Sequence, residues 1–410
     1  MSPLSPEELR FVRTASVFKA GRLAARLVRE PVGVRFEYRE EYLADPNARP
    51  VATTLPIAAE PVRTSAAGAV PPFFAGLLPE GRRLSALRRA VKTSADDDLT
   101  LLLAVGSDTI GDVQVVPEGE LPDGTPAAVT VGEWSELSFD ALFAEMTGDR
   151  LDPKRAAIPG VQGKASARMI SRPVTRAHER FLLKLDPPEF PHLVDNEAFF
   201  LAAARDSGLA AASAEIVVDG SGRRGLLVRR FDRVAANHTN STTMLAQEDA
   251  CQVLGRYPAD KYNLSAVEVV GGLAAATSAP VVAAREVIRQ LAFAYLTGNG
   301  DGHAKNFSVL CDPTGEWRVS PAYDLPSTQP YGDHTTALSI GGKTDERIGR
   351  ADFVALGESV AVRARATERT LSELVDRSDE WLARLDDLPF DARTLHKLRR
   401  AIEYRRGRLR

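Results

Sequence analysis

The segment Gly298-Asn-Gly-Asp-Gly-His-Ala-Lys-Asn-Phe-Ser-Val-Leu310 decides how this chain is interpreted. Within it, Asp301 and Asn306 follow the pattern D-x-x-x-x-N, which is the spacing of a protein-kinase catalytic loop. A carboxylate at the first position accepts the proton of an attacking hydroxyl, and an amide oxygen at the last position binds magnesium. Ordinary turns have the same Gly, Asn and Asp content. The assignment of Asp301 as the catalytic carboxylate therefore depends on the flanking sequence.

That flanking sequence has the order expected of a phosphotransfer site. Two strand-like runs follow Asn306, at residues 307–311 and 317–320, and lead into Pro321-Ala-Tyr-Asp-Leu325. Asp324 there takes the place of the DFG aspartate of a kinase, which binds the metal. A loop, a strand pair and a second aspartate in this order favour a kinase site over a turn. The expected magnesium ligands are Asn306 and Asp324.

A kinase also needs a lysine on a strand to hold the nucleotide's phosphates. Lys184 is the isolated charge in the alternating strand 181–185, and Glu197, at the start of the next helix, is a candidate ion-pair partner. A solvent-facing strand lysine would have the same pattern, so the downstream carboxylates favour the nucleotide role. A glycine-containing stretch just upstream would let main-chain amides approach a phosphate. Its residues are Gly160, Val161, Gln162, Gly163 and Lys164.

Composition excludes several other classes of protein. The 410 residues are 44% apolar and 26% charged, which predicts a folded chain of two or three lobes. A net charge of −3 gives no overall electrostatic attraction to nucleic acid or membrane. Cys251 and Cys311 lack CxxC spacing, so a reducing cytoplasm is expected and a zinc site is not. No signal peptide or membrane span is predicted. Ala337 stands where a Walker A motif needs its first glycine.

Hydrophobic periodicity predicts a mixture of strands and helices. Strands are expected at 23–28, 34–38, 111–116, 180–185, 214–218 and 225–228. Helices are expected at 72–91, 97–105, 139–146, 196–206, 247–254, 265–276, 280–296, 351–359, 364–385 and 391–409. Polar and proline-containing stretches divide the chain into three units, at 1–150, 151–235 and 236–410.

Taken together, these segments resemble the HipA family of bacterial toxin kinases over essentially the whole chain. The most specific stretches are 298–308 and 321–328, supported by Arg230-Phe-Asp-Arg233 and Asp195-Asn-Glu197. Three stretches resemble the family's N-terminal subdomain, at 50–56, 73–79 and 105–113. The resemblance implies an α+β, bilobal kinase-like fold similar to lipid kinases. Its C-terminal lobe would be mostly helical, and an α+β subdomain would precede the two lobes.

The resemblance also implies a function and a set of partners. The chain would be the toxin of a type II toxin–antitoxin system, using ATP and Mg²⁺ to phosphorylate serine or threonine of a bacterial protein and so inhibit growth. Aminoacyl-tRNA synthetases are the known kind of target. A small DNA-binding HipB-like antitoxin would neutralise it, and DNA would be bound through that complex.

Roles for individual residues follow from the same resemblance. Lys184 would contact the phosphates, Asp301 would act as the base, and His303 would lie beside the nucleotide. Arg230 and Phe231 would lie where the lobes join and adenine binds.

Two positions depart from the family pattern. Ala157 replaces a serine whose autophosphorylation inactivates the enzyme, although Ser166 or Ser171 could substitute. Arg229 stands where an acidic residue is common.

Two alternatives to a toxin kinase follow from the sequence, namely a non-catalytic co-repressor acting with an antitoxin and a kinase for a small molecule. The final helix carries many arginines and could bind a phosphate backbone. Cations near a helix C-terminus also complement its dipole, which is the simpler explanation.

Overall fold

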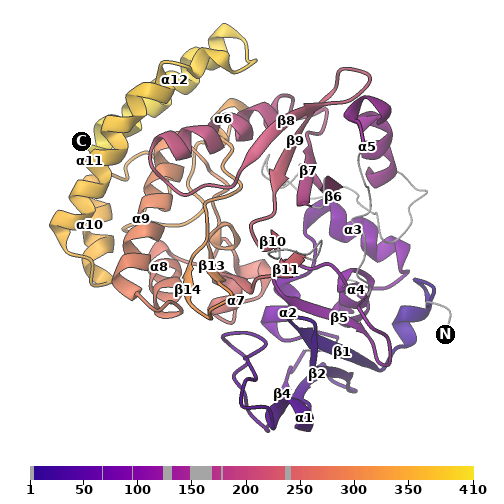
Figure 1. Ribbon diagram of the computed structural model, residues 1–410. Helices are drawn as coiled ribbons and strands as arrows, with labels where there is room; N and C mark the ends of the chain where they lie inside the picture. Colours follow the sequence, from indigo (N-terminus) through magenta and orange to yellow (C-terminus); the bar gives the residue numbers. More distant parts are fainter. Residues whose placement is uncertain are drawn as a thin grey trace.

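The structure is a computed structural model, and it describes residues 4–66, 68–94, 96–122, 132–147, 169–176, 179–235 and 242–410. Helices and strands are intermixed along the chain, which confirms the predicted α+β class. Figure 1 shows the N-terminal subdomain at one end, a small sheet above it, and a helical lobe on the other side. The final helix, α12 (Ala392–Leu409), lies along the outer edge of that lobe.

The N-terminal subdomain is built on a five-stranded antiparallel sheet in the order β4-β3-β2-β1-β5. Its strands are β1 (Thr14–Lys19), β2 (Arg22–Arg29), β3 (Val34–Tyr38), β4 (Val62–Arg63) and β5 (Val113–Pro117). Helices α2 (Pro72–Gly76) and α4 (Asp98–Val105) pack against this sheet, with Phe36 and Phe74 in the shared apolar core. A short helix, α1 (Glu40–Leu43), follows β3.

The helix predicted over 72–91 is two helices, so its continuity was wrong. α2 ends at Gly76, and α3 spans Gly81–Ala90. Pro79 lies between them. A proline has no N–H to donate within a helix, its ring clashes with the preceding turn, and it disfavours helical geometry at the residue before it. The break places Glu80 in the connection, directed toward the helical lobe.

The second sheet has the order β6-β7-β9-β8, with all neighbours antiparallel. Its strands are β6 (Ile170–Arg176), β7 (Glu179–Leu185), β8 (Ala214–Val218) and β9 (Arg224–Arg229). On one face, Phe139 of α5 (Phe139–Thr147) packs with Leu183 and Leu227. The helix expected at 139–146, within the predicted unit 1–150, therefore packs on the sheet of the next unit. The boundaries of the three units stay predictions. On the other face lies α6 (Leu193–Asp206).

The helical lobe surrounds α9 (Pro280–Thr297), whose C-terminal half is almost entirely buried. Trp381 shows how the helices are tied together, since its ring lies edge-on to Phe200 and Phe293 and its Nε1 donates to Ser207 Oγ at 2.9 Å. The other helices are α7 (Ala250–Val253), α8 (Ala266–Ala275), α10 (Arg350–Ser359) and α11 (Ala364–Leu382). Among the residues that the structure describes, no helix is long and apolar enough to cross a membrane.

The predicted helix over 247–254 was wrong in its first turn. Gln247–Asp249 form β12, which pairs with β13 (Ser308–Cys311), and β13 pairs with β14 (Trp317–Val319). Strand pairing with a segment some sixty residues away overrides the local helical spacing. Asp249 then caps α7. Strand β12 thus lies beside β13, the strand that follows the D-x-x-x-x-N loop. A hairpin of β10 (Arg233–Ala235) and β11 (Thr242–Met244) precedes it.

Candidate active site

A buried lysine and two carboxylates form the centre of the candidate site. Lys184 Nζ lies 2.7 Å from Glu197 Oε1, which confirms the predicted pairing, and 3.0 Å from Asp324 Oδ1. β7 supplies the lysine, α6 the glutamate, and the segment after β14 the aspartate. Burial alone would lower the pKa of Lys184, but the two carboxylates outweigh burial and raise it. The ammonium is therefore held in its charged form.

The two carboxylates differ in charge state. Burial raises the pKa of Glu197 to about 7, and the nearby Asp324 charge adds to this effect. Burial would also raise the pKa of Asp324, but Lys184 outweighs it and the pKa is lowered. One positive charge thus faces one fully ionised carboxylate and one that titrates near neutrality.

Asp324 is held in a set geometry by the loop that contains Asn306. Asn306 Nδ2 donates to Asp324 Oδ2 at 2.8 Å, and Asn299 Nδ2 donates to the Asp324 main-chain oxygen at 3.2 Å. The backbone of Asp324 has φ of +56°, a left-handed conformation that is costly for a residue with a Cβ. The strain is consistent with a position that is fixed for function.

Asp301 is buried and is linked to this group through Asn299. Tyr262 donates its hydroxyl to Asp301 Oδ1 at 2.6 Å, and the Asp301 amide donates to Asn299 Oδ1 at 3.0 Å. Asn299 therefore contacts both the Asp301 and Asp324 segments. The structure thus brings together the three loop residues that the motif predicted, along with Lys184 from the small sheet.

His303 is buried next to the same loop. Its ring packs edge-on against Tyr262 with centroids 5.1 Å apart, and its main-chain N–H donates to Asn306 Oδ1 at 3.1 Å. Burial, followed by the positive charge of Lys261, lowers the pKa of His303 to about 4. Within the described residues its Nδ1 has no hydrogen-bond partner. A neutral imidazole with an available nitrogen fits the predicted position beside a nucleotide.

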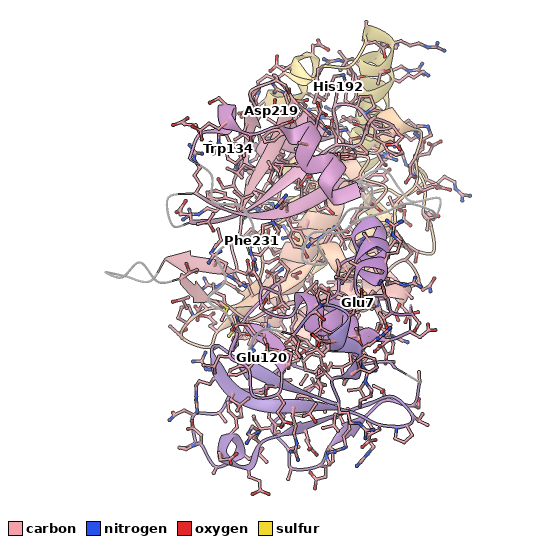
Figure 2. The ribbon with its side chains drawn as sticks, turned by 90° about the vertical axis from the view of Figure 1, so that its right-hand side faces the viewer. Glu7, Glu120, Trp134, His192, Asp219 and Phe231 are labelled. Carbon is pink, nitrogen blue, oxygen red and sulfur yellow. The ribbon has the colours of Figure 1, made fainter. Side chains whose placement is uncertain are left out.

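Arg230 and Phe231 were predicted to lie near adenine. They are located between the N-terminal subdomain and the small sheet. The Arg230 guanidinium donates to Asp108 at 2.8 Å, to the Thr109 carbonyl at 2.8 Å, and to Asp232 at 2.7 Å. Figure 2 shows Phe231 at mid-height, between the N-terminal subdomain and the small sheet. Its ring lies 5.7 Å from that of Tyr323, next to Asp324 in sequence. The Arg230 side chain thus binds the N-terminal subdomain, and its nucleotide role stays a prediction.

Several predicted positions lie outside the described residues. These are the phosphate-loop candidates Gly160, Val161, Gln162, Gly163 and Lys164, together with Ala157 and Ser166. Ser171 is described and lies on β6, in register with Lys184.

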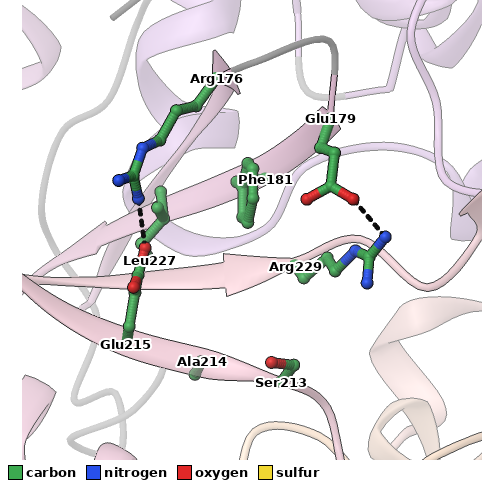
Figure 3. Close-up of a pocket in the computed structure, with 8 residues that line it drawn as sticks. All are labelled: Arg176, Glu179, Phe181, Ser213, Ala214, Glu215, Leu227 and Arg229. Atoms are coloured by element: carbon green, nitrogen blue, oxygen red, sulfur yellow. Dashed lines mark hydrogen bonds and ion pairs between the residues drawn. The ribbon is translucent and has the colours of Figure 1, made fainter.

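A hollow of 380 Å³ opens on the small sheet, lined by residues other than those of the candidate site (Figure 3). Arg229 pairs with Glu179 at one side of it, and Arg176 pairs with Glu215 at 2.5 Å at the other. Phe181 lies at its floor, on the sheet face opposite Lys184, because side chains alternate along a strand. The unusual Arg229 therefore contributes to this hollow through its ion pair.

The residues present fit a magnesium ion. Asp324 and Asn306 offer carboxylate and amide oxygens, each of which has a second lone pair beyond the bonds it already makes. Lys184 faces more carboxylate charge than it can neutralise. No group of three or more His, Cys, Asp or Glu is poised to bind a metal within the described part of the chain. Magnesium at kinase sites commonly takes only one or two protein carboxylates, the rest being phosphates and water.

Four further residues at the site were not predicted, namely Tyr262, Lys261, Lys305 and Glu80. Tyr262 and Lys261 precede α8, and Glu80 comes from the N-terminal subdomain. Tyr262, Lys261 and Glu80 lie far from the D-x-x-x-x-N loop in sequence, so the motif does not point to them. Lys305 lies inside that loop, but its contacts are with other parts of the chain.

Comparison with known proteins gives consistent matches. The model of the HipA-like C-terminal domain matches residues 156–382, and that of the HipA N-terminal domain matches residues 15–116. The chain is 30% identical over 399 residues to a Sinorhizobium fredii protein named "Putative kinase Y4mE", covering 91% of this chain and 92% of that one. It is 28% identical to the serine/threonine-protein kinase toxin HipA of Shewanella oneidensis, covering 71% and 70%.

A solved structure gives the same fold. A chain of the Shewanella oneidensis complex of HipA, HipB and operator DNA superposes with a TM-score of 0.77, covering 96% of this chain and 97% of that one at 21% identity. This match confirms the predicted kinase-like fold with its additional N-terminal subdomain.

Proposed function

The chain belongs to the HipA family, and on that premise we propose that it is an ATP- and Mg²⁺-dependent serine/threonine protein kinase acting as a toxin. The observation that carries this proposal is the convergence of Lys184, Asp324, Asn306 and Asp301 from three separate parts of the chain. The named relatives are kinases or kinase homologues, which supports phosphoryl transfer as the reaction class.

Each residue has a defined task in this proposal. Asp301 accepts the proton of a serine or threonine hydroxyl while the γ-phosphoryl group is transferred to that oxygen. The bond from this group to the β-phosphate breaks, and the nucleoside diphosphate is the leaving group. Lys184 offsets negative charge on the phosphates, and Glu197 keeps the ammonium in place. Asp324 and Asn306 would hold magnesium, which supplies charge neutralisation and alignment of the phosphates. Neutral His303 lies beside the loop as a hydrogen-bonding partner.

The biological setting follows from the relatives. We propose a small HipB-like antitoxin as the neutralising partner, since the structural match is to a chain from a complex of HipA with HipB and operator DNA. DNA would be bound through that complex. The substrate is a bacterial protein in the cytoplasm, of which an aminoacyl-tRNA synthetase is the first candidate to test.

Transfer of label from γ-labelled ATP to proteins of a bacterial lysate tests this function. Wild-type protein and Asp324→Asn are compared, with Asp140→Asn as a matched control because Asp140 is an exposed surface carboxylate. A discrete protein band labelled by the wild type and the control, and absent with Asp324→Asn, is expected. Wild-type protein that binds ATP but labels no protein would contradict the proposal and favour a co-repressor or a small-molecule kinase.

A further inference from the structure

One residue of the N-terminal subdomain reaches the candidate site. Glu80 follows Pro79 in the break between α2 and α3, and its Oε2 accepts a hydrogen bond from Lys261. Its Oε1 lies 3.7 Å from Lys305 Nζ. Both lysine side chains are largely buried, with 13% and 12% of their surface exposed. Glu80 therefore places one carboxylate beside both ammonium groups, and Lys305 has Asp249 as a second carboxylate partner.

The two lysines are direct neighbours, in sequence, of the residues that contact the site carboxylates. Lys261 precedes Tyr262, which donates to Asp301 at 2.6 Å. Lys305 precedes Asn306, which donates to Asp324 at 2.8 Å. Glu80 of the N-terminal subdomain thus contacts Lys261, which is next to Tyr262 and so to Asp301. It also lies near Lys305, which is next to Asn306 and so to Asp324.

Further contacts make this a connected unit. The Ala304 amide donates to the Lys261 carbonyl at 3.1 Å, which joins the two lysine segments. Lys305 Nζ also donates to Asp249 Oδ2 at 2.6 Å and to the Gly76 carbonyl at 3.0 Å. Burial would raise the pKa of Glu80, but Lys305 and Lys261 outweigh it and lower the pKa. The carboxylate therefore stays ionised where the lysines need it.

We propose that Glu80 is a positioning residue for phosphoryl transfer, through which the N-terminal subdomain holds the catalytic loop in its working geometry. Glu80 acts on the reaction through Lys261 with Tyr262 and through Lys305 with Asn306, and touches neither nucleotide nor substrate hydroxyl. The inference rests on the proposed kinase function and assigns part of that function to a subdomain outside the two kinase lobes.

Docking of the N-terminal subdomain does not depend on Glu80 alone. Gln252 Nε2 donates to the Phe73 carbonyl at 2.9 Å, and Gly76 lies so close to Gln252 that an added Cβ would meet its Cγ at 2.6 Å. Thr53 donates to Glu248 through its amide and its hydroxyl, at 2.8 and 2.6 Å. A variant that removes only the Glu80 charge is therefore expected to fold and to remain docked.

The test measures kcat, the KM for ATP and the melting temperature for the wild type, Glu80→Gln, Glu80→Asp and Glu7→Gln. Glu7 is the matched control, because it also pairs with a lysine of the same subdomain, Lys92, at 2.6 Å, but on the exposed surface. Glu80→Gln is expected to lower kcat about tenfold with the KM for ATP unchanged within about twofold. Glu80→Asp, which keeps the charge, is expected to recover part of the rate, and Glu7→Gln to match the wild type.

Two outcomes would overturn the inference. One is a kcat for Glu80→Gln equal to that of the wild type. The other is a loss of kcat that is matched by an equal loss of folded protein or of ATP binding, which would make Glu80 a stabilising residue only. If the wild type transfers no phosphate, it is the proposed function that fails. Amide exchange of residues 299–306 then decides the positioning effect, and unchanged protection in Glu80→Gln would count against it.

Discussion

Two buried groups of charged side chains in this molecule contain similar residues but differ in the ratio of positive to negative charges. At the junction near β10, Arg230 and Arg233 face Asp108 and Asp232, so two positive charges meet two negative ones. At the candidate site, Lys184 faces the carboxylates of Glu197 and Asp324, with Asp301 close by. The ion-paired residues of the first group balance in formal charge, and Arg83 adds a further positive charge near Asp108. The second group has an excess of carboxylates instead.

The difference shows how a structural cluster can be told from a reactive one. At the junction, each arginine reaches Asp232, and the guanidiniums also bind main-chain carbonyls. Burial would raise the pKa of Asp232, but the arginines outweigh it and lower the pKa. At the site, burial instead raises the pKa of Glu197 to about 7. An uncompensated buried charge is costly, and a cation with bound phosphates is the ligand that such a site would stabilise.

The largest expected effect is the loss of activity on changing the site's catalytic carboxylate. Asp301→Asn keeps the shape of the side chain and removes the proton acceptor, so the turnover should fall about a thousandfold. ATP affinity and melting temperature should stay near wild-type values, because the change leaves the ion pairs of Lys184 with Glu197 and Asp324 in place. Single-turnover transfer of labelled phosphate measures the effect, with Asp140→Asn as the control. A rate within tenfold of wild type would remove Asp301 from the proposed role.

The junction should respond in the opposite way. Arg233→Met removes one of the two arginines that neutralise Asp232, whose side chain is only 3% exposed. Arg230 stays paired with Asp232, so the expected cost is that of one lost hydrogen bond between charged groups, about 1.5–3 kcal/mol. Chemical denaturation should show this loss, while kcat per folded molecule should remain near the wild-type value. A loss of kcat larger than the loss of folded protein would show that the two groups are coupled.

The pH dependence of stability should separate the two groups as well. A raised pKa means that the folded state binds the Glu197 proton more tightly than the unfolded state, so this contribution to stability falls as the pH rises from about 4.5 to about 7. The lowered pKa of Asp232 acts with the other sign, and its contribution is lost only as the pH falls below about 4. The two windows do not overlap.

Glu197→Gln removes the first of these titrations. The variant should gain stability relative to the wild type across pH 4.5 to 7, by at most roughly 3 kcal/mol. His303, whose pKa is lowered to about 4, contributes with the opposite sign in both proteins and cancels in the difference. Denaturation midpoints at several pH values measure the effect. A constant difference between variant and wild type would mean that Glu197 is ionised throughout.

The order of residues along the chain was enough to predict the centre of the candidate site. Asp301, Asn306 and Asp324 lie in one continuous motif region, and Lys184 stands out as an isolated charge in an apolar strand. The structure brings Lys184, Asp324 and Asn306 into direct contact and links Asp301 to them through Asn299. Glu80 could not be predicted in this way, because it reaches the loop only through the packing of the N-terminal subdomain on the helical lobe.

The errors in the fold have the same origin. The first turn of the expected helix 247–254 is a strand because it pairs with β13, which only the folded chain brings near. The role of Pro79 in ending α2 was visible in the sequence, but the apolar spacing on both sides of it favoured one long helix. The contact of Arg230 with Asp108 of the N-terminal subdomain was likewise not predicted, and its assignment near the nucleotide stays a prediction. Local patterns thus predicted elements well and long-range partners poorly.

The smallest expected effect concerns Tyr262, which follows Lys261 in sequence and donates a hydrogen bond to Asp301. Tyr262→Phe removes the hydroxyl that donates to Asp301 and keeps the ring that packs against His303. A hydrogen bond to a charged group contributes about 1.5–3 kcal/mol, so loss of its orienting effect should lower kcat about tenfold. Steady-state kinetics measure this, with melting temperature as the check on folding.

If Glu80 acts through Lys261 and Tyr262, the two changes share one route to Asp301. The double variant Glu80→Gln, Tyr262→Phe should then lose less activity than the product of the two single losses, because residues acting through one network are not additive. Independent, multiplicative losses would mean that Glu80 acts on the site only through Lys305 and Asn306, on the Asp324 side. Either result identifies which of the two carboxylates the N-terminal subdomain positions.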